Sequence, residues 1–445
     1  MSERPVIFLH VEKRQLPQKV NYLFAYSVAL FLMTLGLLTD PLPEVLAGFG
    51  RILTSPSQLF TDFIALGNLG SACFNSGLLM LISILLIQRQ HVHLTGPLYA
   101  GIFTVAGYSF FGKNLYNSIP IMLGVYLYAR YMKKPFAHYL LVSLFGSALS
   151  PVVSFITFGL GLPLAWGVAL GYLAGILIGA CLPLLAAQFL HFHQGFTLYN
   201  VGFTSGIIAM FFTGFIRMCS VEVTNQNIIS SDAHEFLLVL SLCAFFGMLL
   251  LGLALMFKLR TPWRNLQTIL NSSGKLMTDF VVIAGLGPTL VNMALMGFLL
   301  LGYVLVVQGT LSGPVIGALL SAVGFSAFGN HIKNSLPVLI GVFLVSTFTS
   351  FHDVNQTGVL VAAIFATSLA PISGYYGSIY GVIAGVLHMT LVFNVGYLHG
   401  GLNLYNNGFS SGFVAGFLVP LLDNFTQVGR EKRIRGKRDL KENRG

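Results

Sequence analysis

Charged side chains are scarce in this chain of 445 residues: they make up 9% of it, whereas 55% of the residues are hydrophobic. A soluble globular domain carries roughly 25% charged residues. The inventory therefore excludes a soluble enzyme and a nucleic-acid-binding domain, and the 13% aromatic residues exclude a disordered chain. Apolar runs of about 20 residues suit membrane helices and are too long for the strands of a barrel. The composition predicts an all-α polytopic membrane protein whose main partner is the lipid bilayer.

Cysteines, acidic residues and metal-binding motifs are equally few. Of the four cysteines, only Cys219 falls in an expected loop, so no disulfide framework is implied. No His-Glu-x-x-His, paired-cysteine or clustered-carboxylate motif occurs, and we expect no metal, no cofactor and no catalytic group. Asp and Glu are absent from the middle of every apolar run, which leaves His388 as the one titratable candidate there. Sodium coupling through backbone carbonyls stays open.

The basic residues lie mainly at the two ends of the chain. Eight of the 24 Lys and Arg fall between Arg430 and Arg444, and four precede residue 20. Cytoplasmic loops of membrane proteins are enriched in Lys and Arg, so we predict a multi-pass protein of the plasma membrane with both termini cytoplasmic. In that orientation the basic loops near 89–93, 130–134 and 258–275 lie inside, and the acidic loops near 40–60, 217–235 and 351–356 lie outside.

Polar breaks divide the chain into fourteen apolar segments. They lie near 21–39, 62–88, 97–112, 115–132, 138–158, 164–190, 196–216, 236–257, 279–307, 313–328, 336–350, 357–372, 376–396 and 404–424. Three of them, 97–112, 313–328 and 336–350, are short for a hydrocarbon core of about 30 Å. We expect about 12–14 membrane segments, the short ones being re-entrant half-helices.

The same pattern occurs twice along the chain. The tripeptide Thr-Asp-Phe at 61–63 recurs at 278–280, an offset of 217 residues, and the same offset relates residues 117–120 to 334–337. A constant, ungapped offset over this length indicates an internal duplication. With small gaps the match continues: residues 198–206 align with 404–412, and Gly171 and Gly175 align with Gly381 and Gly385.

This duplication predicts the organisation of the chain. We divide it into an N-terminus with a first span (1–60), repeat 1 (61–220), a linker span with a basic loop (221–276), repeat 2 (277–424) and a basic cytoplasmic tail (425–445). Each repeat holds six segments, and the single linker span inverts the second repeat relative to the first. Inverted-topology repeats place a binding site or pore near the membrane midplane, at the interface of the repeats.

The repeat resembles a bacterial integral-membrane family described as a duplicated domain of unknown function. This resemblance covers residues 61 to about 424 and implies no established activity. A weaker similarity is to the bacterial urea transporters, which also contain inverted repeats. It is carried by Phe74–Leu78, by Gly112–Ser118 and by the Leu-Tyr-Asn-x-Gly-Phe turns at 198–203 and 404–409. The paired Asn-Pro turn of that family is missing, so the similarity implies an architecture and no substrate.

Polar residues in the turns before apolar helices are the candidate lining of a solute pathway. A first group comprises Asn68, Asn75, Asn292, Lys113, Asn114, Asn117, Ser118, His331, Lys333, Asn334 and Ser335, and a second group comprises Tyr199, Asn200, Ser205, Tyr405, Asn406 and Ser411. Two buried half-helix starts would point backbone donors and positive dipole ends at a solute. The alternative roles are structural: Asn and Ser cap helices for roughly 1 kcal/mol, Tyr joins the interfacial belt, and Lys extends to the membrane surface.

The sequence therefore predicts a permease or channel for a small polar solute, with a midplane pathway between two inverted repeats. The scarcity of charge favours a neutral solute, and a lysine at membrane depth leaves a mildly anionic one open. Two alternatives stay open, an intramembrane scaffold or assembly protein and an intramembrane enzyme, although no nucleophile or metal constellation is visible for the enzyme. We expect no nucleic-acid partner, and a homo-oligomer stays open.

Overall fold

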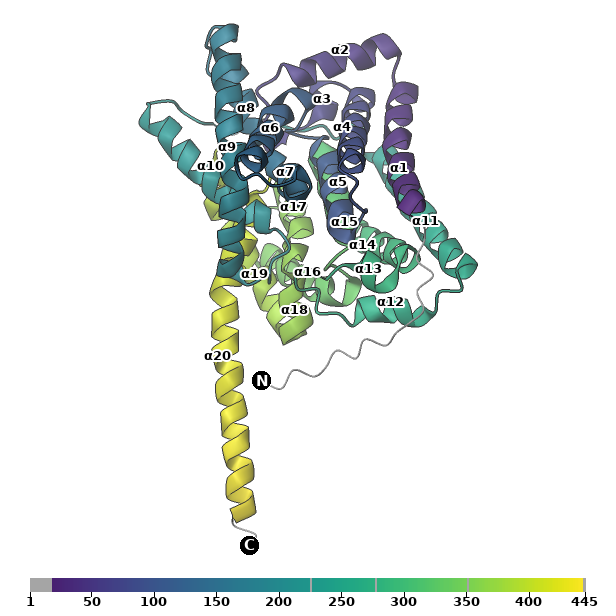
Figure 1. The fold of residues 1–445 in the computed structure, drawn as a ribbon, viewed down its shortest axis with the longest axis vertical. Helices are drawn as coiled ribbons and strands as arrows, with labels where there is room; N and C mark the ends of the chain where they lie inside the picture. The colour runs from purple at the N-terminus through teal and green to yellow at the C-terminus, as the bar shows by residue number, and fades with distance from the viewer. Residues whose placement is uncertain (1–17, 225, 277, 350–351, 443–445) are drawn as a thin grey trace.

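The computed structural model describes residues 18–224, 226–276, 278–349 and 352–442, with side chains described as far as residue 425 (Figure 1). The basic residues Arg4, Lys13 and Arg14 lie outside this part, as do the side chains from Arg430 to Arg444. Within it, nine helical segments are long and apolar enough to cross a membrane. This confirms an all-α polytopic membrane protein. Other expected segments are the shorter helices α5, α6, α15 and α16, of 13 to 17 residues.

The helices fall into two series of the same order. The first comprises α1 (Gln18–Thr39), α2 (Leu42–Leu53), α3 (Phe63–Leu66), α4 (Leu69–Arg89), α5 (Gly96–Tyr108), α6 (Leu115–Tyr131), a broken segment (η1 Phe136–Tyr139, α7 Leu140–Gly146, η2 Ser147–Leu149, α8 Ser150–Ser154, η3 Phe155–Gly159), α9 (Leu164–His193) and α10 (Asn200–Met218). The second comprises α11 (His234–Lys258), α12 (Trp263–Leu270), α13 (Phe280–Ala284), α14 (Leu286–Val306), α15 (Gly313–Phe325), α16 (Ile332–Phe348), a broken segment (α17 Thr357–Ala366, η4 Thr367–Leu369, α18 Ala370–Tyr376), α19 (Ser378–His399) and α20 (Asn406–Glu442).

The equivalence of the two series includes their first helices. Helix α1 packs on α4 so closely that a Cβ added at Gly36 would lie 2.5 Å from the carbonyl oxygen of Gly70. Helix α11 packs on α14 in the same way, and a Cβ at Gly252 would lie 2.9 Å from the carbonyl oxygen of Gly287. Small residues let membrane helices approach this closely. Helix α11, the expected linker span, is thus the structural counterpart of α1.

Short amphipathic helices occupy opposite edges of the compact group of helices in Figure 1, α2 at its upper edge and α12 at its lower edge, above the extended end of α20. Helix α2 buries Val45, Gly48 and Ile52 at helical spacing, and α12 buries Leu266 and Ile269. The exposed remainder of each helix is partly polar. A helix of this kind suits the boundary between an apolar layer and water.

The two halves meet through α5 and α15, which lie together near the centre of Figure 1. A Cβ at Gly107 would lie 2.2 Å from the carbonyl oxygen of Gly317. At the other end of the crossing, a Cβ at Gly324 would lie 3.2 Å from the Cα of Ala100. Because 100 and 107 correspond to 317 and 324, the two contacts are the same contact with the roles exchanged, as they are about a two-fold axis. The order of the contacts shows that the two helices run antiparallel.

Hydrogen bonds between the halves are reciprocal as well. The Asp62 carboxylate accepts a bond from Ile64 N (2.8 Å) at the start of α3 and one from Gly313 N (3.0 Å) in the other half. The Asp279 carboxylate caps α13 and accepts a bond from Gly96 N (3.0 Å). Each aspartate therefore caps its own helix and joins it to the start of α5 or α15 in the opposite half.

The repeated four-residue spacing of glycines in α9 makes its sequence alignment with α19 ambiguous. A Cβ at Gly381 would contact the Pro337 ring at 3.0 Å, and the residue that meets the equivalent Pro120 at 2.9 Å is Gly175. The predicted pairing of Gly171 with Gly381 is therefore wrong by one helical turn. The spacing Gly-x-x-x-Gly occurs in overlapping copies along α9, so the sequence alone fits either register.

The connection between the halves closes back on the first half. Strand β2 (Asn227–Ile228) pairs in parallel with β1 (Phe60–Thr61), and Gln226 N donates to the Gln58 side-chain oxygen at 2.6 Å. Asp62 N also donates to the Ile228 carbonyl oxygen at 2.9 Å. These bonds bring residues 226–229 beside the start of repeat 1.

Candidate functional site

Six buried aromatic rings gather where the two halves meet, and we call them the central aromatic cluster. Its members are Tyr108, Phe145, Tyr199, Phe325, Phe365 and Tyr405. They form three equivalent pairs, 108 with 325, 145 with 365 and 199 with 405. Ring centroids lie 4.9 Å apart for Tyr108–Tyr405 and 4.4 Å for the equivalent Tyr199–Phe325, and Tyr199 meets Tyr405 at 5.3 Å. Every contact in the cluster thus has its counterpart, apart from the pair on the axis.

The tyrosine hydroxyls of the cluster have no partner within hydrogen-bonding geometry. Among the described residues, none makes such a bond to the hydroxyls of Tyr108, Tyr199 or Tyr405, and each of these side chains is 1% exposed. The Tyr405 hydroxyl nevertheless lies within interaction distance of the Tyr108 hydroxyl and of Thr104 Oγ1, at a geometry too poor for a well-formed hydrogen bond. A buried hydroxyl without a partner costs roughly 1–3 kcal/mol, and native proteins rarely leave one unsatisfied. These groups are available to a solute or to water.

Two loops of matching shape flank the cluster, residues 109–114 and 326–331. The amide nitrogen of Asn75 donates to the carbonyl oxygens of Ser109 (2.7 Å) and Lys113 (3.0 Å). Asn292 makes the equivalent bonds in the other half, both at 2.8 Å. Each loop turns at a glycine with positive φ, Gly112 at +68° and Gly329 at +94°, a conformation that favours glycine. The two asparagines therefore hold the loops, and each keeps an unpaired amide oxygen.

The other predicted residues of the first loop cap α6. Asn114 accepts a bond from Asn117 N (3.0 Å), Asn114 N donates to the Asn117 side chain (2.9 Å), and Ser118 Oγ donates to the Asn114 carbonyl (2.7 Å). The Asn117 amide nitrogen also donates to Ser154 Oγ at 2.9 Å. Capping accounts for most of their hydrogen-bonding capacity.

The second loop caps α16 with a different residue. His331 stands where Asn114 stands in the first half, and its Nδ1 lies 3.4 Å from Asn334 N. The Asn334 side chain accepts from His331 N at 2.9 Å and donates to the Gly329 carbonyl at 2.8 Å, while Ser335 donates to Asn334. The side chains of His331, Asn334 and Ser335 are thus also bonded within the protein.

The two lysines singled out in the sequence lie in different environments. Lys113 is 1% exposed and donates to Ser147 Oγ, in the break between α7 and α8. Lys333 is exposed and donates to the Asn271 side chain at 3.0 Å. The equivalent of Lys113 is Asn330, which donates to Thr367 Oγ1 at 3.4 Å in the other break. Asn330 was missed, although the constant offset of 217 residues leads to it.

Asn68 lies at the start of α4, half-buried beside α2. Its side chain accepts a bond from Ser71 N (2.7 Å) and donates to the Glu44 carbonyl (3.2 Å). It caps the helix and is bonded to the end of the molecule that carries α2.

The Leu-Tyr-Asn turns contain matching histidine–asparagine pairs. His193 Nε2 lies 3.0 Å from Asn200 Oδ1, and His399 Nδ1 lies 2.7 Å from Asn406 Oδ1. Each turn also binds the opposite half, because Leu198 N donates to the Ser368 carbonyl (3.0 Å) and Leu404 N to the Ala148 carbonyl (3.1 Å). Ser411 bonds Thr197 across the halves at 2.9 Å, whereas Ser205 Oγ is buried and unpaired within the described chain.

Repeat 2 adds a buried polar pair that repeat 1 does not have. His388, in the middle of α19, is fully buried, and its Nε2 lies 3.2 Å from Asn407 Oδ1. The register of α9 and α19 places Leu182 and Val201 at the equivalent positions. Neither of these apolar residues can make such a bond.

A cavity of about 410 Å³ with a mixed polar and apolar lining opens beside this pair. We call it the Asn407 cavity; its polar lining includes Gln226, Asn227, Gln356, His399, Asn406 and Asn407. Asn406 is the predicted pathway residue that lies in its wall, and it directly follows Tyr405 of the central aromatic cluster. The cavity wall and the cluster therefore share one turn of the chain, although none of the six rings lines the cavity.

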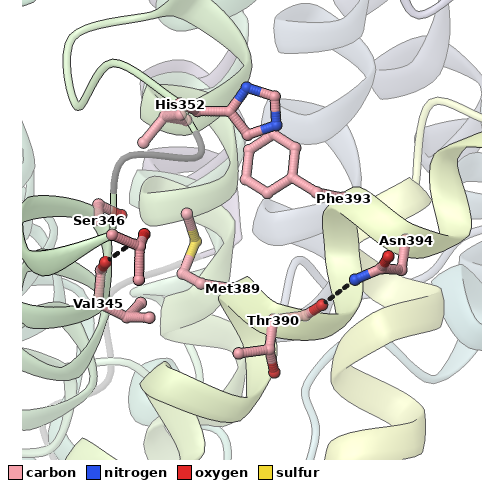
Figure 2. Close-up of a pocket in the computed structure, with 9 residues that line it drawn as sticks. Val345, Ser346, His352, Met389, Thr390, Phe393 and Asn394 are labelled. Carbon is pink, nitrogen blue, oxygen red and sulfur yellow. Dashed lines mark hydrogen bonds between the residues drawn. The ribbon is translucent and has the colours of Figure 1, made fainter.

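A second cavity of about 400 Å³ lies between α16 and α19 (Figure 2). Figure 2 shows Thr390 and Asn394 on its wall, with the Asn394 amide donating to the Thr390 carbonyl at 2.6 Å. His352 and Phe393 line both cavities, and their ring centroids lie 4.3 Å apart. This pair of rings separates the two spaces.

The described part of the chain shows no clustered metal ligands and no disulfide. Among the described residues no group of three or more His, Cys, Asp or Glu side chains is placed to hold a metal ion. The four cysteines are free, and Cys73 is the buried one.

Together these features define a class: a helical membrane protein of two equivalent halves whose buried polar turns meet at its centre. The chain belongs to the family described as "Protein of unknown function (DUF1576)", whose model matches it twice, at residues 42–218 and 259–424. This confirms the resemblance to a duplicated family of unknown function. The two matches begin 217 residues apart, at α2 and just before α12. No curated protein and no solved structure matches the chain.

Proposed function

We propose that this protein is a permease or channel for a small polar solute, and that the solute crosses at the central aromatic cluster. The observation that carries the proposal is the set of three buried tyrosine hydroxyls where the two halves meet, none of which forms a well-aligned hydrogen bond to a described residue. A scaffold or assembly protein has no need of unpaired hydroxyls at its centre, since each weakens the folded state. No enzymatic activity forms part of the proposal.

In this proposal the two halves cross the plasma membrane in opposite directions, with both termini cytoplasmic. Three observations support the inversion: α5 and α15 pack antiparallel with reciprocal contacts, α2 and α12 lie at opposite edges of the group of helices, and the flanking charges differ. Asp40 and Glu44 lie beside α2, whereas Lys258, Arg260 and Arg264 lie at α12. Basic segments favour the cytoplasmic side.

We also infer that α5–α6 and α15–α16 are re-entrant pairs. Helices α5 and α15 have 13 residues each, roughly 20 Å at 1.5 Å per residue, against a hydrocarbon core of about 30 Å. The loops that follow them are buried. Irregular backbone at membrane depth is tolerated where protein covers it or where it lines a wet cavity.

The pathway in this proposal runs from the Asn407 cavity to the cluster. The support for this route is that Asn406 lies in the cavity wall and the preceding residue, Tyr405, belongs to the cluster. The six rings are in mutual contact and close the centre of the protein. Passage therefore requires the rings to move, either as a gate or as part of alternating access between the two halves.

Solute flux into proteoliposomes tests the proposal. Stopped-flow light scattering measures swelling after an osmotic gradient of glycerol, acetamide, small amino acids or small carboxylates. We expect at least one solute to enter several-fold faster than into protein-free vesicles, and Tyr405→Phe to slow that entry. The matched control is Tyr99→Phe, because the buried Tyr99 hydroxyl donates to the Asn21 carbonyl at 2.9 Å, away from the cluster. If no solute enters faster than into empty vesicles, the proposal fails and the scaffold alternative is favoured.

A further inference from the structure

We propose that the Asn407 cavity is a binding site for an uncharged solute that carries a carbonyl or hydroxyl oxygen, and that the Asn407 amide recognises this oxygen. This inference rests on the proposed function and makes it more specific, because it names the class of solute and the half of the protein that binds it.

The chemistry of the lining favours an uncharged solute. Its polar side chains are mainly amides, from Gln226, Asn227, Gln356, Asn406 and Asn407, with two histidines and Thr357. None of the described lining residues is Asp, Glu, Lys or Arg. A charged solute would lose its water without gaining a counter-charge, which is costly, whereas amides can replace the hydrogen bonds that a neutral polar solute makes to water.

The cavity is open at one end and closed at the other. Asn227 and Gln356 are exposed, and Tyr397 is 71% exposed. Asn406 and Asn407, at the closed end, are 7% and 3% exposed. A volume of about 410 Å³ falls in the range of roughly 300–1,000 Å³ for small-molecule pockets. A small solute can therefore enter from the surface and be enclosed at the inner end.

Asn407 differs from its neighbour in what its amide has left to offer. Asn406 uses both amide atoms, with the oxygen on His399 (2.7 Å) and the nitrogen on the Val392 carbonyl (3.5 Å). Asn407 uses only its oxygen, which faces His388 Nε2 at 3.2 Å. In the described part of the chain its amide nitrogen makes no hydrogen bond, and it is not among the fully buried atoms. This nitrogen is a donor left open to the cavity.

The fold does not require this arrangement. Repeat 1 builds the same turn with Val201 at the position of Asn407 and Leu182 at the position of His388. The turn closes equally well with an apolar pair, so the polar pair contributes something other than folding. A donor oriented by a buried histidine is suited to binding an acceptor atom.

Cysteine protection tests the site without any need for flux. In a background in which the four native cysteines are replaced, Thr357→Cys, which places a thiol in the lining and keeps the Asn407 amide, is treated in detergent with neutral, anionic and cationic methanethiosulfonate reagents. We expect the neutral reagent to react at least ~tenfold faster than either charged reagent, which corresponds to about 1.4 kcal/mol. Acetamide and glycerol should slow the reaction, and acetate and methylammonium at the same concentration should not. Val201→Cys is the matched control, because that position lies outside the lining.

Two results would overturn the inference: equal or faster reaction with a charged reagent, or protection of the Thr357→Cys thiol by acetate or methylammonium and not by acetamide or glycerol. If Thr357→Cys does not fold, as judged by thermal unfolding, Gln356→Cys at the open end serves for the same measurements. Protection without flux in the vesicle assay would support the binding site and contradict the transport function. Flux without protection would support the transport function and contradict the binding site.

Discussion

The two halves of the molecule agree where they hold the fold and differ where they line the centre. Asp62 and Asp279 make the same cap and the same bond to the opposite half, and Asn75 and Asn292 hold the same loop. These shared bonds join backbone to side chain, and their loss would open buried turns. The duplicated part of the sequence therefore fixes the geometry.

Four of the many differences between the halves change the polarity of buried positions. The equivalent positions of the two halves hold Tyr108 and Phe325, Lys113 and Asn330, Leu182 and His388, and Val201 and Asn407. Each exchange adds or removes a polar group without altering the backbone contacts around it. A symmetric pathway offers the same groups to both ends of a solute, so residues that break the symmetry are the ones that can distinguish one end of a solute from the other.

The largest expected effect comes from the contact that joins the halves. Gly107→Leu places a side chain 2.2 Å from the Gly317 carbonyl oxygen, and we expect a loss of more than about 3 kcal/mol and little folded protein. Gly302→Leu in α14 is the control, because nothing lies within 4 Å of its added Cβ. Size-exclusion profiles and thermal unfolding measure the outcome. Equal stability of the two variants would contradict the close packing of α5 on α15.

The two aspartates should differ in what their loss costs. Asp62 is fully buried and accepts bonds from the backbone N–H groups of Ile64, Ser230 and Gly313. Asp279 is half-buried and accepts two such bonds. We expect Asp62→Ala to lower the free energy of unfolding by about 3 kcal/mol and Asp279→Ala by about 1.5 kcal/mol. Thermal unfolding in detergent compares them, and a larger cost at Asp279 would refute the ranking.

Replacing Lys113 by the residue of the other half should change selectivity. The protonated form of a buried lysine beside the pathway repels cations, so Lys113→Asn should raise the entry of methylammonium relative to acetamide by about fivefold, given the strength of charge interactions in a low-dielectric interior. Lys333→Asn is the matched control, since that lysine is exposed. Unchanged selectivity in Lys113→Asn would place the lysine away from the pathway.

The smallest effect is expected from Tyr108→Phe, which makes position 108 identical to its equivalent, Phe325. The hydroxyl makes no well-aligned hydrogen bond to a described residue and only a weak contact with the Tyr405 hydroxyl, so stability should change by less than about 1 kcal/mol, while loss of one bond to the solute should slow flux about two- to tenfold. Swelling rates and unfolding temperatures separate the two effects. A large fall in stability with unchanged flux would mean that the hydroxyl is structural.

The sequence predicted the parts of the site that the duplication repeats. The constant offset and the recurring turns identified Asn75, Asn292, Tyr199 and Tyr405 before any coordinates. The structural equivalence of α1 and α11 was not predicted, because helices that face lipid are alike in hydrophobicity but have few identical residues. Tyr108 and Phe365 were not predicted as site residues, because an aromatic residue in an apolar helix carries no periodic signal.

Other features could be identified only from the structure. The Asn407 cavity is formed partly by residues 226–229, which only the pairing of β2 with β1 brings to α19 and α20. Asn407 itself interrupts the repeated turn, so a search for identical positions passes over it. The capping roles of Asn114 and Asn117 were foreseen as an alternative, and their hydrogen bonds follow it.

The central claim is that the two halves cross the membrane in opposite directions, and one pair of cysteine substitutions tests it. His91 follows α4 and Gln308 follows α14, 217 residues apart; both are exposed and share nearly the same φ, 54° and 55°. In the cysteine-free background, His91→Cys and Gln308→Cys are labelled in intact cells and in inverted vesicles with an impermeant maleimide. The account predicts that the thiol at position 91 reacts only from the cytoplasmic side and the thiol at position 308 only from the outside. Reaction of both from the same side would contradict it.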